Sequence, residues 1–240
     1  QSVARRKAVI ETMVAKRIPC VVVSRSLAPT PEMIDVLEQA GVPLFRTPLS
    51  SKAFTTEVTV LLEERFAPRT SLHGTLLEIR GVGTLIRGAS GAGKSEAALA
   101  LIERGHSLVA DDLVKVKLLS DHTPIGFCDP LSRGFMECRG IGIINIEKLF
   151  GNRFVRIEKK IDLVVTLIEE AVNAEPDRTG LDRKYFQILG FDVPQMEIPV
   201  RTGRDIARLI EVAAMVQAAR QFGYDSADDL NEKLLRKMNH

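Results

Sequence analysis

The hydrophobic pattern of the first part of the chain alternates between segments typical of helices and segments typical of strands. Residues 3–17 show a helical pattern, and the β-branched run at residues 19–24 is typical of a short buried strand. Thr30 is a preferred residue for the cap before a helix, Pro31 suits the first helical position, and Gly41 suits the position after the helix ends. These features predict a helix, a strand and a second helix in that order.

The next residues continue this alternation. Residues 42–47 predict another strand and residues 50–66 another helix, so we expect part of an open parallel sheet with covering helices. Residues 67–71 combine proline with polar residues and show no hydrophobic period, which predicts a linker. We therefore expect two domains, at residues 1–67 and 68–240.

The second region opens with a predicted hairpin. Residues 74–88 have the pattern of two strands joined by a glycine-rich turn. Residues 107–119 have the pattern of one strand that Asp111 and Asp112 interrupt, with apolar alternation resuming after them. Residues 159–170 predict a further strand.

Two helices are predicted near the end of the chain. One face of the first carries apolar residues three and four positions apart: Ile206, Leu209, Ile210, Ala213 and Ala214. Ser226 predicts the cap of the last helix, in which Leu230, Leu234 and Met238 lie in register. We expect this stripe to form a core or subunit contact, and a partner surface is the alternative.

A glycine-rich run follows the predicted hairpin and precedes a helical pattern. It fits G-x-x-x-x-G-K-[ST], the phosphate-binding P-loop, in consecutive residues: Gly88, Ala89, Ser90, Gly91, Ala92, Gly93, Lys94 and Ser95. Glycines allow backbone N–H groups to point at phosphate oxygens, and the following helix adds its positive end. Lys94 suits contact with the β/γ-phosphates, and the Ser95 hydroxyl suits Mg²⁺. The alternative is a plain glycine-rich turn; the motif and its context favour a nucleotide-phosphate site.

Composition narrows the functional class only slightly. The 240 residues are 45% hydrophobic and 27% charged with a net charge of +2, which gives no reason to expect nucleic acid or a membrane as partner. The three cysteines show no C-x-x-C spacing, so neither a disulfide framework nor a zinc site is indicated, and we expect a cytoplasmic location. No apolar run approaches the ~20 residues of a membrane helix. Because Gln1 opens a helical pattern, we expect that an N-terminal part has been removed.

Beyond the P-loop, the second region contains residues of types suited to phosphoryl transfer: His73, Asp111, Asp112, Glu137 and Arg139. The segments "HG", "GASGAGKSE", "RGHSLVADD", "ECRGIGIIN", "DRTGLD" and "IPVRTGR" occur in this order. Together they resemble HPr kinase/phosphorylase, a bacterial family that phosphorylates and dephosphorylates a seryl residue of the phosphocarrier protein HPr. The resemblance covers residues 72–222, and residues 1–67 look like the end of the N-terminal domain of that family.

The resemblance implies a fold and an activity. The fold would be an α/β catalytic domain with a P-loop and a core like that of phosphoenolpyruvate carboxykinase, preceded by part of a smaller α/β domain. The activity would use ATP and Mg²⁺ to phosphorylate HPr or a paralogous carrier. The reverse reaction would use inorganic phosphate and release pyrophosphate. The family also implies a homohexamer.

The resemblance further assigns roles to single residues. Lys94 and the loop amides would stabilise phosphate charge, and Ser95 and Glu137 would bind Mg²⁺ through oxygen atoms. Asp112 would accept the seryl proton, and His73 would bias the protonation of that carboxylate. From the residues alone, an aspartate pair is also a common strand-ending turn, Glu137 is as well explained as a surface carboxylate, and His73 as a bystander.

The cationic residues form a second group, and the resemblance links each of them to the site: Arg139, Arg178, Arg201 and Arg204. Arginine suits forked contact with phosphate. Arg178 would be catalytic, and the segment with Arg201 and Arg204 would serve dephosphorylation. The alternative for these arginines is solvated loop charge.

Two other functions use the same sequence features. One is a small-molecule or carboxykinase-like phosphotransferase, and the other is a nucleotide-sensing module without transfer activity. The chain departs from the usual family pattern at Ala89, Ala92, Cys138 and Ile141, and none of these positions replaces a charged or nucleophilic group. A sensing module would have lost its base, yet His73 and both aspartates are present.

Overall fold

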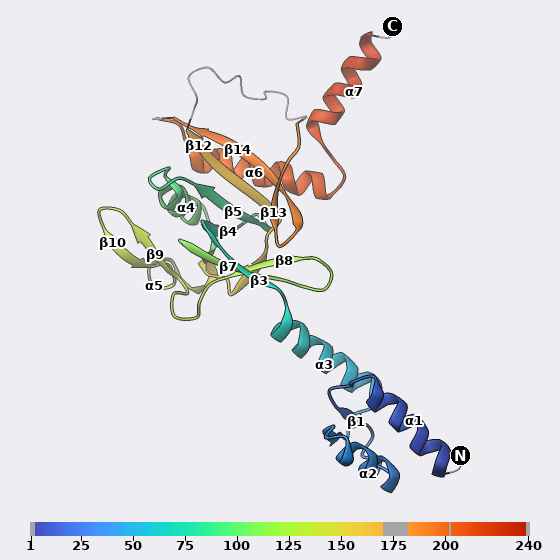
Figure 1. Cartoon of the computed structure of the whole chain (residues 1–240). Coiled ribbons are helices and arrows are strands. Elements are labelled where there is room, and N and C mark those ends of the chain that lie inside the picture. Colours follow the sequence, from blue (N-terminus) through green and yellow to red (C-terminus); the bar gives the residue numbers. More distant parts are fainter. Residues whose placement is uncertain (1–2, 170–181, 202, 239–240) are drawn as a thin grey trace. The chain divides into compact units, whose positions relative to one another are not determined.

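The computed structural model of the chain describes residues 3–169, 182–201 and 203–238 (Figure 1). It divides into two compact units, Gln1–Phe66 and Ala67–His240. Mixed α/β structure is present in both units, as we expected from the alternating pattern.

The first unit contains three helices and one pair of strands among its described residues. In chain order these are α1 (Val3–Ala15), β1 (Val21–Val23), α2 (Pro31–Gln39), β2 (Leu44–Arg46) and α3 (Ser51–Phe66). The two strands pair in parallel, as predicted. Ile10, Val36 and Leu37 form the small core of this unit. Thr30 does stand at the cap position of α2, but its side chain makes no capping hydrogen bond there.

The main sheet of the second unit has six strands in the order β13-β14-β12-β5-β4-β6. Their bounds are β4 (Thr75–Ile79), β5 (Val82–Gly88), β6 (Ser107–Ala110), β12 (Leu163–Glu169), β13 (Lys184–Ile188) and β14 (Phe191–Val200). β12 runs parallel to both β5 and β14, and β4 and β5 form the predicted antiparallel hairpin. The carboxyl ends of β5, β12 and β14 therefore lie at one edge of the sheet.

Two smaller sheets accompany the main one. A four-stranded sheet has the order β11-β8-β7-β3, with bounds β3 (Arg69–His73), β7 (Leu113–Leu118), β8 (Pro124–Phe127) and β11 (Glu158–Lys160). A separate hairpin joins β9 (Phe135–Cys138) and β10 (Gly142–Asn145). A short helix, α5 (Ile146–Phe150), and a 3₁₀ turn, η1 (Asn152–Phe154), follow the hairpin.

Each face of the main sheet is covered by a different layer. Helices α4 (Lys94–Glu103) and α6 (Ile206–Gln221) pack on one face, where Ile86, Leu101 and Ile210 are fully buried (Figure 1). The four-stranded sheet covers the other face, and Leu85 and Val116 lie in the core between the two sheets. Because the central strands are buried on both faces, their sequences are almost continuously apolar.

Two predictions about strands were wrong in detail. Residues 67–71 are not a linker, because β3 begins at Arg69 and pairs with β7. Residues 107–119 are not one interrupted strand: β6 pairs with β4 in the main sheet, whereas β7 belongs to the four-stranded sheet. Asp111 and Asp112 stand where the chain passes from one sheet to the other.

The last helix, α7 (Ser226–Met238), differs from the prediction at its start. Asp225, not Ser226, provides the capping oxygen, since its side chain accepts a hydrogen bond from the backbone N–H of Ala227 at 2.9 Å. The stripe of Leu230, Leu234 and Met238 is exposed, so it forms no core contact with the described residues. No helix among the described residues is long and apolar enough to cross a membrane.

Candidate active site

The glycine-rich run forms the connection between β5 and α4. Gly88 approaches β12 so closely that a side-chain Cβ there would lie 2.9 Å from the carbonyl oxygen of Leu167. Gly93 has a φ of 86°, a left-handed conformation that glycine adopts without strain, and α4 begins directly after it. No side chain caps this helix, so its first N–H groups are available to an anion.

Lys94 is the first residue of α4, and its side chain turns back over the loop. The Nζ atom donates hydrogen bonds to the carbonyl oxygens of Gly88 at 3.1 Å and Ala89 at 2.9 Å. The ammonium group therefore lies over the start of the loop, where its positive charge faces the same space as the helix N-terminus. Ser95 follows in the first turn of α4 and is half-buried.

The β9–β10 hairpin reaches the loop through Arg139. The Nη2 atom of this arginine donates to the Ser90 hydroxyl at 3.3 Å. Its Nη1 atom lies 3.4 Å from the place that a Cβ on Gly91 would occupy. The hairpin and the loop, which are far apart in sequence, thus adjoin, and Arg139 adds a second cation at the loop.

The two neighbouring aspartates have different surroundings. Asp111 is half-buried, and its carboxylate accepts hydrogen bonds from the Thr75 hydroxyl at 2.7 Å and from the backbone N–H of Glu137 at 3.2 Å. Burial raises the pKa of Asp111, and the two hydrogen bonds oppose that effect. Asp112 is exposed and has a φ of 62°, so the chain turns sharply between the sheets and separates the two side chains.

His73 ends β3 beside this turn. The register of β3 and β7 places His73 opposite Leu113, the residue after Asp112. The N–H of Gly74 also donates to the Asp112 carbonyl oxygen at 3.0 Å. The backbone therefore holds His73 and Asp112 next to each other, with both side chains exposed.

The predicted magnesium ligands are Ser95 and Glu137. Hydroxyl and carboxylate oxygens are the donors that Mg²⁺ prefers, and Mg²⁺ usually binds through one or two carboxylates together with substrate phosphates. Consistent with such an open site, no group of three or more histidine, cysteine, aspartate or glutamate side chains suited to a metal occurs among the described residues. The Glu137 side chain is exposed, while its backbone N–H is fixed by Asp111, so the residues fit a shared metal.

The remaining predicted arginines lie after β14 or outside the description. Arg201 and Arg204 are exposed in the turn between β14 and α6, and Arg204 Nη1 donates a long hydrogen bond of 3.4 Å to the Pro199 carbonyl oxygen. This turn follows the carboxyl end of β14, at the same sheet edge as the glycine-rich loop. Arg178 lies outside the described residues.

Sequence reasoning did not identify two residues that contact this region. Thr75 is fully buried and bonds Asp111, and nothing in its sequence context distinguishes it. Arg87 immediately precedes the glycine-rich loop, and its guanidinium carbon lies 4.2 Å from the ring centroid of Phe186. A charged residue at the end of an otherwise apolar strand was a signal that could have identified Arg87.

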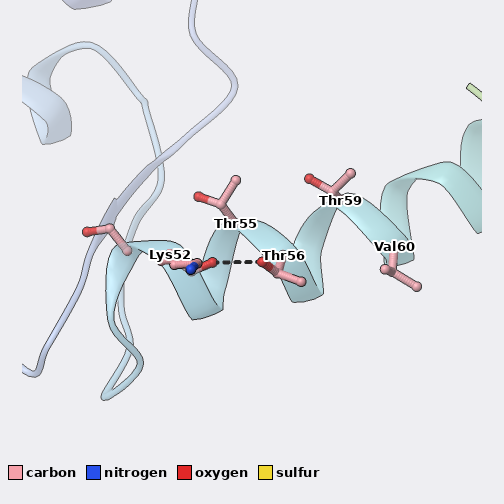
Figure 2. A pocket seen from close by; sticks show the side chains of 6 residues that line it. Lys52, Thr55, Thr56, Thr59 and Val60 are labelled. Carbon is pink, nitrogen blue, oxygen red and sulfur yellow. Dashed lines mark hydrogen bonds between the residues drawn. The ribbon is translucent and has the colours of Figure 1, made fainter.

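A surface hollow on the first unit offers no comparable chemistry. Figure 2 shows the α3 side chains that line it, and the Thr56 hydroxyl donates to the Lys52 carbonyl oxygen at 3.0 Å. The lining consists of Ser51, Lys52, Thr55, Thr56, Thr59 and Val60. With a single lysine as its titratable group, the hollow has no acid–base pair and no anion-binding loop.

Comparison with known proteins agrees with this geometry. Residues 64–234 match the HPr serine kinase C-terminal domain, and residues 2–62 match the HPr serine kinase N terminus. An HPr kinase/phosphorylase of Leptospira biflexa is 44% identical over 217 residues, which cover 90% of this chain and 67% of the relative. An HPr kinase/phosphorylase of Geobacter sulfurreducens is 42% identical over 240 residues, covering 99% of this chain and 75% of the relative.

A solved structure shows the same similarity in three dimensions. The HPr(Ser) kinase/phosphatase from Coxiella burnetii matches with a TM-score of 0.60 and 34% identity, covering 68% of this chain and 99% of that structure. The matched domains together span nearly the whole chain, and the glycine-rich loop, the aspartate pair and the arginine hairpin adjoin within them. The chain belongs to the HPr serine kinase family.

Proposed function

We propose that this chain is an ATP-dependent protein-serine kinase that phosphorylates a seryl residue of HPr or a paralogous carrier, and that it also catalyses the reverse phosphorolysis. One observation supports this proposal above all: the glycine-rich loop adjoins a hairpin arginine and an exposed aspartate at one edge of the sheet. Phosphoryl transfer requires a clamp for the donor phosphates, cationic groups and a proton acceptor. All three are available in this region.

In the forward direction, the loop N–H groups, Lys94 and the α4 N-terminus bind the β- and γ-phosphates of ATP. The seryl oxygen attacks the γ-phosphorus as the bond to the β-phosphate oxygen breaks. Asp112 takes the hydroxyl proton, and phosphoserine and ADP form. Ser95 and Glu137 hold Mg²⁺, which neutralises phosphate charge when it is bound.

In the reverse direction, an oxygen of inorganic phosphate attacks the phosphorus of phosphoserine. The bond between phosphorus and the seryl oxygen breaks, Asp112 returns a proton to that oxygen, and pyrophosphate forms. His73 adjoins Asp112 along the backbone, and its imidazole biases the proton on the carboxylate in both directions. Arg139 supplies charge beside the loop.

The finer features of the family belong to the same proposal. The second unit has a core like that of phosphoenolpyruvate carboxykinase, the chain assembles as a homohexamer, and it acts in the cytoplasm. The exposed apolar stripe of Leu230, Leu234 and Met238 on α7 supports a role for this helix in contacts with another chain.

The test incubates the protein with ATP labelled in the γ-phosphate, Mg²⁺ and purified HPr. Label on a seryl residue of HPr is the expected result, followed by its release as labelled pyrophosphate when inorganic phosphate replaces ATP. Absence of phosphoserine on HPr and on its nitrogen-system paralogue would refute the proposal. Transfer to a small acid instead of HPr would favour a carboxykinase-like enzyme, and nucleotide binding without any transfer would favour a sensing module.

A further inference from the structure

Arg87 occupies an unusual position for a charged side chain. It is the penultimate residue of β5, directly before the glycine-rich loop. Alternation along the strand places Ile86 on the face covered by α4, while Arg87 shares the opposite face with Leu85. The side chain therefore projects toward the four-stranded sheet, which carries His73, and away from α4.

The side chain is held in place by apolar contacts. Its Cγ atom lies 3.3 Å from the place that a Cβ on Gly74 would occupy, so the stem packs against the backbone of that glycine. The guanidinium stacks over the ring of Phe186 on β13, with 4.2 Å between its carbon and the ring centroid. A cation at this distance from an aromatic face is attracted to it, and the ring orients the guanidinium before any ligand arrives.

The charge of Arg87 has no counter-ion among the described residues. Its Nε atom is buried without a hydrogen-bond acceptor, and no ion pair joins the guanidinium to a described carboxylate. Burial alone lowers the pKa of Arg87, although an arginine side chain remains charged at neutral pH. A half-buried cation without a partner is costly in the free protein, and an anion in contact with it would relieve that cost.

The neighbours of Arg87 indicate which anion this is. On one side Gly88 opens the loop that binds the donor phosphates. On the other side Gly74 packs against the Arg87 stem, and its N–H bonds the carbonyl oxygen of Asp112. Arg87 thus lies between the phosphate loop and the backbone that holds the proton-accepting aspartate.

We propose that Arg87 contacts the phosphoryl group on the acceptor side of the site, where a phosphomonoester, the phosphoserine of the carrier protein, is bound. The inference rests on the proposed function. Phosphoserine brings about two negative charges near neutral pH, whereas the unmodified serine is neutral. The contact therefore contributes more to binding of the phosphorylated carrier than to binding of ATP or of the unphosphorylated carrier.

The test compares Arg87→Gln, which removes the charge and keeps most of the stem, with Arg87→Lys and with Phe186→Leu. Phe186→Leu is the matched control, because it removes the stacking ring and leaves the charge. Each variant is checked for folding by circular dichroism and thermal melting. Steady-state assays then give KM for phosphorylated HPr at saturating phosphate and KM for ATP at saturating HPr. Equilibrium titrations measure the affinity for phosphorylated and unphosphorylated HPr.

For Arg87→Gln we expect KM and Kd for phosphorylated HPr to rise by ~10- to 100-fold, the effect of losing a charge-assisted hydrogen bond. KM for ATP and affinity for unphosphorylated HPr should change by less than about threefold, a difference below 1 kcal/mol. Arg87→Lys and Phe186→Leu should show smaller increases of the same selectivity. They also keep the inference testable if Arg87→Gln does not fold.

An unchanged KM for phosphorylated HPr in a folded Arg87→Gln variant would overturn the inference while leaving the proposed function intact. An equal rise in KM for ATP would also overturn it, since the arginine would then only shape the loop. If the parent protein transfers no phosphoryl group, the proposed function fails first and the inference fails with it.

Discussion

The aspartate pair offers the sharpest test of the mechanism, because adjacent residues can be changed in the same way. Asp112→Asn removes the proton acceptor and preserves shape. Asparagine also tolerates the left-handed backbone that Asp112 adopts at φ 62°, so little strain is added. Loss of a general base slows transfer by ~10²- to 10⁴-fold, which corresponds to ~3–5 kcal/mol in the activation barrier.

Asp111→Asn should behave differently, for a reason visible in its contacts. The asparagine carbonyl oxygen can accept from the Glu137 N–H, and its amide group can donate to Thr75, whose hydroxyl is both donor and acceptor. Both buried partners stay satisfied, so transfer should fall by less than about tenfold, or ~1.4 kcal/mol. Asp111→Ala is the contrasting variant: it leaves the Thr75 hydroxyl and the Glu137 N–H without their acceptor and should lower the free energy of unfolding by ~1–3 kcal/mol.

The assay measures single-turnover transfer from ATP to HPr for the parent and the three variants, with ATP affinity measured separately by titration. We expect Asp112→Asn alone to lose transfer while retaining ATP affinity. If Asp111→Asn loses transfer and Asp112→Asn is nearly silent, the assignment of the base to Asp112 is wrong. Urea denaturation separates a slow enzyme from an unstable one.

Three further variants test other parts of the site and the fold. Lys94→Ala removes the ammonium over the loop and should slow both directions by ~10²- to 10³-fold with little change in unfolding; activity within tenfold of the parent would refute the P-loop role. Arg204→Ala should lower phosphorolysis about tenfold more than phosphorylation, measured with limiting substrate away from equilibrium, and equal losses would show a general positioning role. Desolvation lowers the pKa of His106 from 6.5 despite the nearby Glu211, and Arg80 and Arg104 also face this group and lower its pKa. The unfolded chain then binds a proton first, so the melting temperature should fall as pH drops from about 6.5 to 5, and His106→Gln should flatten that slope; a parallel slope would refute the assignment.

The strands that sequence reasoning identified correctly are those with strong local signals. β4, β5 and β12 are apolar on both faces because a layer covers each side of the main sheet, and such runs are recognisable without knowledge of their neighbours. β3 lacks this signal. It lies at the edge of the smaller sheet, it alternates exposed and half-buried residues, and only its pairing with β7 makes it a strand.

The division of residues 107–119 between two sheets has a similar origin. β6 and β7 both satisfy a strand pattern, and nothing local specifies that they pair with different partners. The turn at Asp112 separates them, and the left-handed conformation of an aspartate is uncommon but permitted, so composition alone does not reveal it. For the same reason the distinct environments of Asp111 and Asp112 could not be derived from their adjacency.

The cationic groups of the site share their support because of the strand directions. β5 ends at the glycine-rich loop, and β14, two strands away and parallel through β12, ends at the turn with Arg201 and Arg204. Asp205, the cap of α6, then bonds Arg104 at the far end of α4 with 2.8 Å between Nη2 and Oδ2. The arginine turn is thus tied to the helix whose first residues form the phosphate loop. Because a short helix is stiff, this ion pair holds the second cationic segment at a fixed distance from the loop, as a site that handles two phosphates requires.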